Sequence, residues 1–427
     1  MGEQTPKQVV IVGGSLGGLF IGIVFTRLGH NVTILERTSA DVLRDQGAGI
    51  SVSPCLTAIY ESIKALGTSG APVIDFFTEY DRTGFPYYDG RCKDKSFRFL
   101  KRDGSVKQDL KTPLLLGTCS WDLLYNVLRA NFDGGYEMGY VPAAGKREGD
   151  GETRYLDGVR FTGVRDLGDD LIRIEYEGLD GEKKTLDANL LIGADGPSST
   201  VRKLMLPKSE RKWAGYVAWR GNVKESEISR ETLDIMGENV TFFYLKGGHI
   251  LHYKIPGYHG TLKEGDRMCN IVWYHNVDES GLQRILTDSC GQLHKFSLGA
   301  GMIRPQVREE QRKISEAILT KPMNEIFQKM EQPFIQAVTD NLTTKAVFMG
   351  GKVLIVGDAV AGLRPHTTGG LSQGAMHALF LKSVFEKDAT MSLEEWERRV
   401  IGFATTASKI GVDFGTLSQF GDHPQAE

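Results

Sequence analysis

The stretch from residue 8 to residue 18, Gln-Val-Val-Ile-Val-Gly-Gly-Ser-Leu-Gly-Gly, decides the fold. The apolar run Gln8–Val12 predicts a buried strand, and the glycines that follow it predict a tight turn. Apolar residues then continue to about Gly29, which predicts a helix, and residues 32–35 predict a second strand. The stretch therefore predicts one strand–helix–strand unit of the kind that binds dinucleotides.

The residues of the turn have separate uses in such a unit. Glycines make the turn tight, let the backbone approach a pyrophosphate, and allow the helix to pack on the strand. Gly13 and Gly18 take the first and third glycine positions, and Ser15 stands at the second, where its hydroxyl can donate to a phosphate oxygen. Free N–H groups at the start of the helix add to the phosphate site. The predicted phosphate contacts are Gly13, Ser15, Leu16, Gly17 and Gly18.

A carboxylate follows the second strand at Glu36. There it can accept hydrogen bonds from ribose hydroxyls, whereas its charge would repel a 2′-phosphate. We also assign the neighbouring Arg37 to the cofactor site. This pattern alone does not distinguish FAD from NAD, and a glycine-rich turn without a ligand is the alternative.

Two later segments have the same strand-to-turn character. The first reads Leu191-Ile192-Gly193-Ala194-Asp195-Gly196-Pro197-Ser198-Ser199. The second reads Val356-Gly357-Asp358-Ala359 and continues with Arg364-Pro365-His366-Thr367-Thr368-Gly369-Gly370. Each alone is typical of an ordinary junction between a strand and a loop. Their order and spacing behind the first motif indicate that the three segments act together.

Together the three segments resemble the fingerprints of the para-hydroxybenzoate hydroxylase family of FAD-dependent aromatic monooxygenases, and the resemblance covers nearly the whole chain. Residues 13–18, 364–367 and 270–274 are similar to the branch that contains 2,6-dihydroxypyridine 3-hydroxylases and fungal 4-hydroxybenzoate 1-hydroxylases. The resemblance implies FAD as the cofactor, NAD(P)H and O2 as co-substrates, and a small aromatic substrate.

The resemblance also implies particular cofactor contacts. Asp358 is expected to hold the ribityl chain of FAD, Pro365 to lie beside the flavin, and Arg44 to lie near the diphosphate. The remaining expected contacts are Asp195, Gly369, Gly370 and Leu371. Three positions depart from the family pattern: Ala361 replaces a usual His, Ser372 a frequent Asn, and Trp121 a frequent Arg. These departures affect individual flavin contacts and leave the backbone scaffold intact.

The chain is long enough for two domains. Its 427 residues, 41% of them apolar, exceed the size that one core usually serves. We expect an α/β fold with a Rossmann-like FAD-binding domain at residues 1–200 and 286–385. An antiparallel β-sheet substrate domain is expected as an insertion at residues 201–285, and a C-terminal helical segment at residues 386–427.

Several local patterns refine this expectation. Short alternating runs between residues 141 and 181 predict antiparallel hairpins, and the aromatic and β-branched segments of residues 213–276 predict a separate sheet. An apolar run at residues 353–356 predicts another strand. A helix is expected at about residues 369–385, and an amphipathic segment begins at Leu393.

Charge and cysteine usage narrow the class of partner. The balance of 51 Lys and Arg against 54 Asp and Glu offers no strong field for nucleic acid or an anionic membrane. Five cysteines without a CxxC pair predict reduced thiols in the cytoplasm, not a disulfide framework or a metal site.

The apolar stretch at residues 9–25 carries five glycines, which favours a strand, turn and helix over a membrane anchor. A homodimer is left open.

The reaction that the resemblance implies is carried by the cofactor. NAD(P)H reduces FAD, O2 adds at the flavin 4a carbon as a hydroperoxide, and one oxygen is transferred to a phenolic or hydroxypyridine-type ring, with or without loss of a carboxyl group. The helix after Gly370 has an N-terminal partial charge that would stabilise a reduced flavin. Since no second dinucleotide fingerprint is evident, NAD(P)H is expected to bind transiently.

The candidate catalytic residues are those that can polarise a ring hydroxyl. Deprotonating or hydrogen-bonding a phenol makes its ring more reactive, and His and Tyr side chains suit that role. The candidates are His366, beside Pro365, and Arg220, His252 and Tyr274 of the expected sheet, with Tyr216 and His249 as further possibilities. An aromatic pocket wall of Trp219, Tyr253, Trp273 and Tyr274 is expected for the ring. The alternative for each sheet residue is a packed position. Arg220 could instead contact the flavin or an anionic group of the substrate, and His366 could brace its loop through a backbone hydrogen bond.

Two other functions fit the same scaffold. One is a flavin halogenase or an oxidase that transfers no oxygen, although the Trp-x-Trp-x-Ile-Pro string usual in halogenases is absent from the sequence. The other is a flavin-binding protein without turnover, a hypothesis to which Ala361 and Ser372 lend some weight. Substrate-stimulated NAD(P)H oxidation with labelled O2 separates these functions from monooxygenation.

Overall fold

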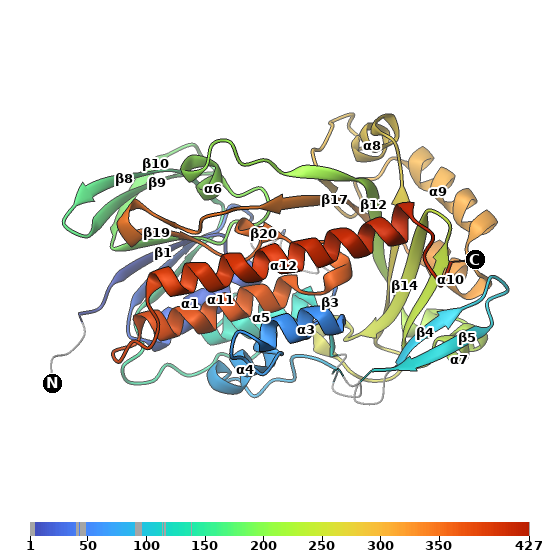
Figure 1. Ribbon diagram of the computed structural model, residues 1–427, viewed down its shortest axis with the longest axis horizontal. Coiled ribbons are helices and arrows are strands. Elements are labelled where there is room, and N and C mark those ends of the chain that lie inside the picture. Colours follow the sequence, from blue (N-terminus) through green and yellow to red (C-terminus); the bar gives the residue numbers. More distant parts are fainter. Residues whose placement is uncertain are drawn as a thin grey trace.

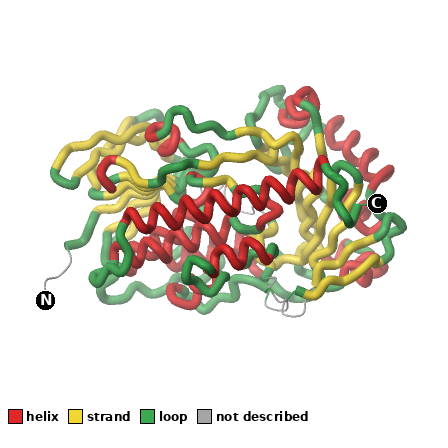
Figure 2. Tube along the Cα trace, viewed as in Figure 1, coloured by secondary structure: helices red, strands yellow, loops and turns green. Residues whose placement is uncertain are grey.

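Two large sheets lie toward opposite ends of an elongated molecule, and a long C-terminal helix runs along both (Figures 1 and 2). This computed structural model describes residues 5–39, 42, 48–89, 96–112, 114, 117–137 and 139–426. The predicted α/β fold class is confirmed, as the similar solved structures reported below also show.

The first sheet has six strands and gathers all three motifs at one edge. Its order is β18-β19-β11-β1-β2-β7. The strands are β1 (Gln8–Val12), β2 (Asn31–Leu35), β7 (Thr153–Leu156), β11 (Leu190–Gly193), β18 (Val347–Phe348) and β19 (Val353–Ile355). β1, β11 and β19 are parallel, so the turns after them meet at their carboxyl ends. Ligands bind at this edge in open α/β sheets.

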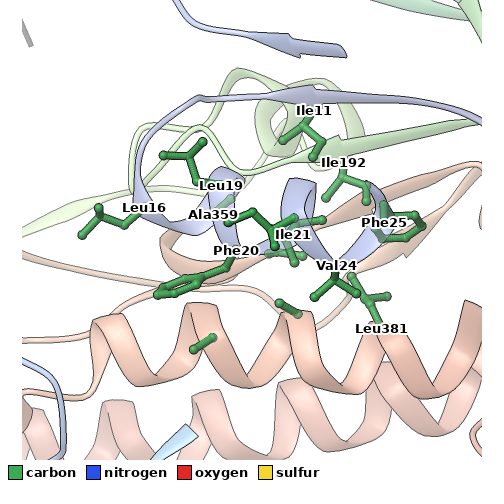
Figure 3. Close-up of a cluster of buried hydrophobic side chains, with 14 of the residues drawn as sticks. Ile11, Leu16, Leu19, Phe20, Ile21, Val24, Phe25, Ile192, Ala359 and Leu381 are labelled. Atoms are coloured by element: carbon green, nitrogen blue, oxygen red, sulfur yellow. The ribbon is translucent and has the colours of Figure 1, made fainter. Parts of the chain in front are cut away.

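Helix α1 (Leu16–Arg27) is buried on nearly every side. It packs between the six-stranded sheet and α11 (Gly370–Phe385), with α5 (Trp121–Phe132) and α4 (Pro72–Tyr80) beside it. Figure 3 shows Ile11 and Ile192 of the sheet on one side of α1 and Leu381 of α11 on the other. The all-round apolar character of α1, which could suggest a membrane anchor, therefore reflects burial within the protein.

The predicted hairpins form a small antiparallel sheet with the order β10-β9-β8. Its strands are β8 (Val159–Gly168), β9 (Leu171–Gly178) and β10 (Lys183–Ala188). The buried residues Ile172, Ile174 and Tyr176 alternate with more exposed neighbours along β9. One face of this sheet thus packs on the main core.

The second large sheet is the antiparallel sheet expected from residues 213–276, but it is larger. Its order is β16-β17-β12-β15-β14-β13-β4-β5, with β20 paired to β17. The strands are β4 (Ser96–Leu100), β5 (Val106–Lys111), β12 (Lys212–Lys224), β13 (Val240–Leu245), β14 (Gly248–Ile255), β15 (Met268–Asn276), β16 (Ser297–Leu298), β17 (Phe334–Leu342) and β20 (Ala361–Gly362). Only the pairing of β13 with β4 is parallel among its described pairings. The sheet draws strands from outside residues 201–285, and the domain boundaries stay a prediction.

The two faces of this sheet have different neighbours. One face carries a second apolar core that includes residues of α7 (Arg230–Met236), α8 (Glu279–Leu286), α9 (Pro305–Ile318) and α10 (Lys321–Lys329). Trp219 and Trp273 both lie in this core, with ring centres 6.3 Å and 5.1 Å from that of Phe327. Because strand side chains alternate, their neighbours in sequence face the opposite side.

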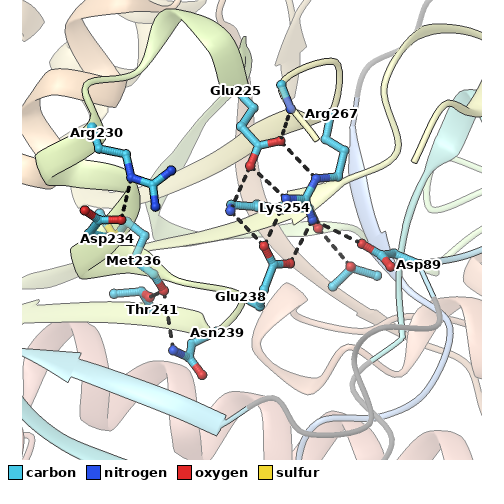
Figure 4. Close-up of polar contacts among 12 residues, drawn as sticks. Asp89, Glu225, Arg230, Asp234, Met236, Glu238, Asn239, Thr241, Lys254 and Arg267 are labelled. Atoms are coloured by element: carbon cyan, nitrogen blue, oxygen red, sulfur yellow. Dashed lines mark hydrogen bonds and ion pairs between the residues drawn. The ribbon is translucent and has the colours of Figure 1, made fainter. Parts of the chain in front are cut away.

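An ionic cluster, buried except for the partly exposed Glu238, holds one end of this sheet (Figure 4). Lys254 Nζ lies 2.8 Å from carboxylate oxygens of both Glu225 and Glu238, and Arg267 pairs with the same two carboxylates at 2.8 Å. Arg267 also lies 3.6 Å from Asp89, which ties the loop before β4 to the sheet. Burial alone would raise the pKa of Glu238, but hydrogen bonds from Arg267 and Lys254 hold it at about 2.

Helix α12 (Leu393–Phe420) connects the two halves of the molecule. It starts at Ser392, whose hydroxyl accepts from the N–H of Glu395, and it packs beside α11 before reaching β14, β15 and β17. Trp396 and Phe403 anchor it in the main core. The remaining described α-helices and strands are α3 (Thr57–Lys64), α6 (Thr200–Met205), β3 (Gly49–Ser51) and β6 (Thr118–Ser120). None of the helices formed by the described residues is long and apolar enough to cross a membrane.

Candidate cofactor and substrate site

A cavity of about 810 Å³ runs from the first glycine-rich turn to the nine-stranded sheet. Ser15, Leu16 and Gly17 line one part of it, and Asp358 and the segment 363–371 line another. The sheet contributes Arg220, His249, Tyr253 and Tyr274. The carboxyl edge of the parallel sheet and one face of the antiparallel sheet therefore enclose the same space.

The glycines of the first motif divide into packing glycines and a cavity glycine. A Cβ on Gly18 would collide with the carbonyl oxygen of Gly13, and Gly13 itself has φ of +102° and lies against the backbone of Ala194. A Cβ on Gly17, in contrast, would meet no atom within 4 Å. Gly17 therefore lies where a ligand can approach the backbone, while Gly13 and Gly18 hold the turn against the sheet and helix.

The side chain of Glu36 holds the glycine-rich turn through hydrogen bonds to backbone N–H groups. Its carboxylate accepts the N–H of Gly14 at 2.7 Å and the N–H of Thr38 at 2.8 Å. The side chain is buried and does not line the cavity, so its ribose contact stays a prediction. Arg37 is exposed and also lies outside the cavity wall, and Arg44 falls outside the described residues.

Tyr155 adds a support that the sequence did not reveal. Its hydroxyl donates to the carbonyl of Gly14 at 2.9 Å and lies 3.1 Å from the hydroxyl of Tyr125. Arg129 donates to Tyr125 at 2.9 Å and its guanidinium lies over the ring of Tyr155. The glycine-rich turn is thus fixed by side chains from β7 and α5 before any ligand binds.

The carboxylate of Asp195 accepts hydrogen bonds from three neighbouring residues of the protein. Ser199 donates to one carboxylate oxygen, and the N–H groups of Thr200 and Val201 donate to the other at 2.6 Å and 3.2 Å. The carboxylate therefore caps the start of α6. Asp195 is absent from the cavity wall, and its expected contact with the cofactor stays a prediction.

Asp358 has the opposite character. It lies in the cavity wall after β19, and no described residue donates a hydrogen bond to its carboxylate. Burial raises its pKa to about 6, although the positive charges of Arg211 and Arg202 lower it. An acceptor of this kind is satisfied by hydroxyl donors from a ligand, as the ribityl chain of FAD would supply.

The loop between Arg364 and Gly370 is held rigidly against the sheet. Arg364 forms two hydrogen bonds with Asp340 at 2.8 Å and 2.6 Å. Nε2 of His366 lies 2.8 Å from the hydroxyl of Tyr216. Thr368 has φ of +49°, unusual for a β-branched residue, and its hydroxyl accepts from the N–H of Cys55 at 2.7 Å. Pro365, Gly369, Gly370 and Leu371 all line the cavity, as predicted contacts of the flavin would.

Three of the four predicted catalytic residues line the cavity, and the fourth does not. Tyr274, Arg220 and His366 line it, together with Tyr253 and His249. His252 is fully buried and does not line the cavity, because β14 alternates and His249, Leu251 and Tyr253 occupy its cavity face. The geometry therefore favours His249 in place of His252.

The expected wall of four aromatic rings is also corrected. Tyr253 and Tyr274 face the cavity, but Trp219 and Trp273 belong to the second core on the opposite face. The four had been grouped by composition, and the alternation of side chains along β12 and β15 separates them.

Burial fixes the protonation of the cavity residues. It lowers the pKa of His366 to about 3, with a further lowering by Arg364, and it lowers the pKa of His249 well below its usual value. Burial raises the pKa of Tyr274, partly opposed by Arg220. At neutral pH the two histidines are therefore uncharged and can accept a hydrogen bond, while the Tyr274 hydroxyl is a donor.

Several residues that line the cavity were not predicted from the sequence. They are Phe97, Phe99, Leu110, Val240, Phe242 and Tyr244 of the outer strands, and Phe414, Leu417, His423, Pro424 and Gln425 of the C-terminal segment. The spacing of Phe97 with Phe99, and of Phe242 with Tyr244, was a usable signal because residues two apart share a strand face. Trp121, one of the departures from the family pattern, also lines the cavity and stacks on Tyr125 at 4.8 Å. Ala361 and Ser372 are fully buried.

The residues present fit FAD. Three loops gathered at one sheet edge, the open backbone at Gly17 and the unpaired carboxylate of Asp358 match a dinucleotide with a hydroxylated chain. The fold and this site are those of a flavoprotein, with FAD as the cofactor.

Comparison with known proteins agrees with this class. A protein-family model described as "FAD binding domain-like" matches residues 213–340. The chain is 29% identical to 2,6-dihydroxypyridine 3-monooxygenase of Paenarthrobacter nicotinovorans over 93% of this chain and 88% of the relative. It is 26% identical to salicylate hydroxylase of Pseudomonas putida over 89% of this chain and 76% of the relative.

The solved structure of 2,6-dihydroxypyridine-3-hydroxylase from Arthrobacter nicotinovorans superposes with a TM-score of 0.75 at 25% identity, covering 99% of this chain and 96% of that one. These similarities confirm the resemblance that the three motifs indicated: the chain has the fold and cofactor of the FAD-dependent aromatic monooxygenases.

Proposed function

We propose that the protein is an FAD- and NAD(P)H-dependent monooxygenase that hydroxylates a phenolic or hydroxypyridine-type ring, with or without loss of a carboxyl group. The observation that carries this proposal is the shared cavity. It places the flavin-side loop, through Pro365 and His366, against the sheet residues Tyr274 and His249. The ring centres of His366 and Tyr274 are 4.5 Å apart.

The cofactor would be held by residues already in position. Gly17 and its neighbours would face the pyrophosphate, Asp358 would accept from the ribityl hydroxyls, and residues 365–371 would border the flavin. When bound, FAD supplies the electron transfer from NAD(P)H and the activation of O2. The N-terminus of α11 places positive partial charge beside the flavin site, which favours an anionic reduced cofactor.

The substrate ring would be oriented by the sheet. The Tyr274 hydroxyl would donate a hydrogen bond to the ring hydroxyl, and an uncharged histidine, His249 or His366, would accept a hydrogen bond from it. The guanidinium of Arg220, which donates to the carbonyl of Gly49 at 3.0 Å, would attract a ring that has become anionic. This arrangement raises the electron density of the ring without a permanent charge on either histidine.

NAD(P)H is proposed to bind transiently. Small aromatic rings are the proposed substrate class in line with the named relatives, which are a dihydroxypyridine monooxygenase and a salicylate hydroxylase. A cytoplasmic location and a homodimer stay predictions.

A panel experiment tests the proposal. Purified FAD-loaded protein is incubated with hydroxypyridines and hydroxybenzoates, and NADH and NADPH oxidation is followed separately. The proposal predicts oxidation stimulated by at least one ring. The product should be heavier by one oxygen atom, or, if the carboxyl group is replaced by a hydroxyl, lighter by the difference between carbon dioxide and one oxygen atom. Stimulated oxidation that yields only hydrogen peroxide would indicate an oxidase, and no stimulation by any ring would favour a non-catalytic flavin protein.

A further inference from the structure

The cavity continues past the ring-binding residues along the outer strands of the nine-stranded sheet. The pairing register aligns Tyr274 of β15 with His249 of β14, and His249 with Tyr244 of β13. In the next row on the same face, Leu251 of β14 lies opposite Phe242 of β13, and Phe242 opposite Phe99 of β4. The cavity wall therefore extends strand by strand away from the flavin loop.

The chemical character of this wall changes along its length. Near β12, β14 and β15 it carries Arg220, His249, Tyr253 and Tyr274, which are polar or charged, beside the apolar Leu251 and Val272. The part that we name the outer wall consists of Phe97, Phe99, Leu110, Val240 and Phe242. No charged side chain lines the cavity from the described residues of β4, β5 and β13. The part of a ligand that lies against the outer wall therefore contacts apolar side chains.

Three rings along this wall lie in a row with nearly parallel planes, and Phe97 meets Phe242 edge-on at 73°. Phe99 and Phe242 have ring centres 5.6 Å apart with planes inclined by 19°, and Tyr244 continues the row at 6.0 Å from Phe242. The imidazole of His423 covers Tyr244 at 3.9 Å, so the C-terminal tail closes the near end of this surface. Leu110, at the far end, is 46% exposed. The outer wall is thus covered by the C-terminal tail at its Tyr244 end and accessible to solvent at Leu110.

The dimensions exceed those of one ring. From β15 to β4 there are three strand-to-strand steps of about 4.8 Å, or about 14 Å in total. A single hydroxylated ring anchored at Tyr274 and His249 would leave the outer wall in contact with water. Aromatic surface of this size is stabilised by contact with an apolar ligand.

We infer that the natural substrate carries an apolar substituent, alkyl or aryl, that lies against Phe97, Phe99 and Phe242 while its hydroxylated ring lies at Tyr274. This inference rests on the proposed function. It narrows the substrate class from small hydroxylated rings to rings with an apolar extension. Ring hydroxyls give orientation in this arrangement, and the extension gives most of the affinity.

The test measures binding to the FAD-loaded protein, without turnover. Phenol, 4-ethylphenol, 4-butylphenol and 4-hexylphenol are titrated, and the dissociation constant is read from the change in flavin absorbance. We expect it to fall by roughly fourfold for each added methylene group that reaches the outer wall, as apolar transfer predicts. 4-Phenylphenol distinguishes an aryl from an alkyl extension. A phenol with a carboxylate at the end of an alkyl chain should bind more weakly than its neutral counterpart.

Two variants test whether the outer wall causes the dependence of affinity on chain length. In Phe242→Ser the ratio of the phenol to the 4-hexylphenol dissociation constant should fall at least tenfold. Leu179→Ser, on the exposed turn between β9 and β10, should keep the ratio of the parent. A dissociation constant that stays flat or rises with chain length would overturn the inference, as would an unchanged ratio in Phe242→Ser. Oxygenation of phenols without a chain-length effect would leave the proposed function standing, whereas tight binding of long phenols without any oxygenation would contradict that function alone.

Discussion

The hydroxyl of Tyr216 lies 2.8 Å from Nε2 of His366, and this contact joins the antiparallel sheet to the loop that precedes α11. Tyr216 is fully buried and His366 nearly so. The flavin side of the cavity is therefore fixed relative to the substrate side by a hydrogen bond within the protein.

Tyr216→Phe tests this connection. The substitution leaves a buried ring nitrogen of His366 without its partner, so we expect the free energy of unfolding to fall by about 1–3 kcal/mol. Urea denaturation of the apoprotein measures it. Tyr258→Phe, at a residue that is 64% exposed, is the control and should change stability by less than about 0.5 kcal/mol. Equal stability of Tyr216→Phe and the parent would show that the contact is not formed in solution.

The carboxylate of Asp358 predicts a pH-dependent affinity for FAD. Its pKa in the folded apoprotein is about 6, above the usual 3.8, because burial disfavours the charge. Ribityl hydroxyls donate to the ionised form, so FAD should bind most tightly above pH 6 and more weakly as the pH falls through 6. Fluorescence quenching of FAD between pH 5 and pH 8 measures this. Asp358→Asn should bind about ten- to a hundredfold more weakly and lose that pH dependence. Parallel pH profiles for variant and parent would refute the assignment.

Alanine substitutions at Asp195 and Asp358 should have different effects on protein stability and on FAD affinity. Asp358→Ala removes the acceptor in the cavity and should lose most FAD affinity. Asp195→Ala removes the cap of α6, so we expect about 1 kcal/mol of lost stability with a smaller change in FAD affinity. Thermal unfolding and FAD titration of both variants provide the comparison. A larger loss of affinity in Asp195→Ala than in Asp358→Ala would reverse the two roles.

Gly17 and Gly18 provide a second matched pair. A Cβ at Gly17 meets no protein atom within 4 Å, so Gly17→Ala should fold normally and bind FAD more weakly because the methyl group crowds the pyrophosphate. A Cβ at Gly18 collides with the backbone of Gly13, so Gly18→Ala should be destabilised whether or not FAD is added. Circular dichroism melting, with FAD titration, measures both. Normal stability of Gly18→Ala would contradict the described turn.

The strands and helices that carry the cofactor site were predictable from the sequence because local signals define them. The apolar run at Gln8–Val12, the glycines after it and the helix after Gly370 lie where periodicity placed them. The substrate side was harder. Strand pairing over long separations decides which residues share a face, and composition alone grouped Trp273 with Tyr274 although the sheet separates them. The covering of Tyr244 by His423 joins residues far apart in the sequence and left no local signal.

The electrophilic character of the proposed oxygen transfer requires a ring hydroxyl. The methyl ether of a true substrate should bind in the cavity yet yield far less product for each NAD(P)H consumed. Tyr274→Phe, which removes the expected donor, should lower the yield from the phenol itself and change its pH profile. Coupling is measured as product formed per NAD(P)H oxidised. Full coupling with the methyl ether would rule out ring activation through the hydroxyl.

The origin of the added oxygen shows whether the protein is a monooxygenase. FAD-loaded protein is given NAD(P)H, a ring that stimulates its oxidation, and isotopically labelled O2 in unlabelled water, and the product is analysed by mass spectrometry. We expect one labelled oxygen atom in each product molecule. A product that carries only unlabelled oxygen from water, or labelled hydrogen peroxide with an unchanged ring, would contradict it.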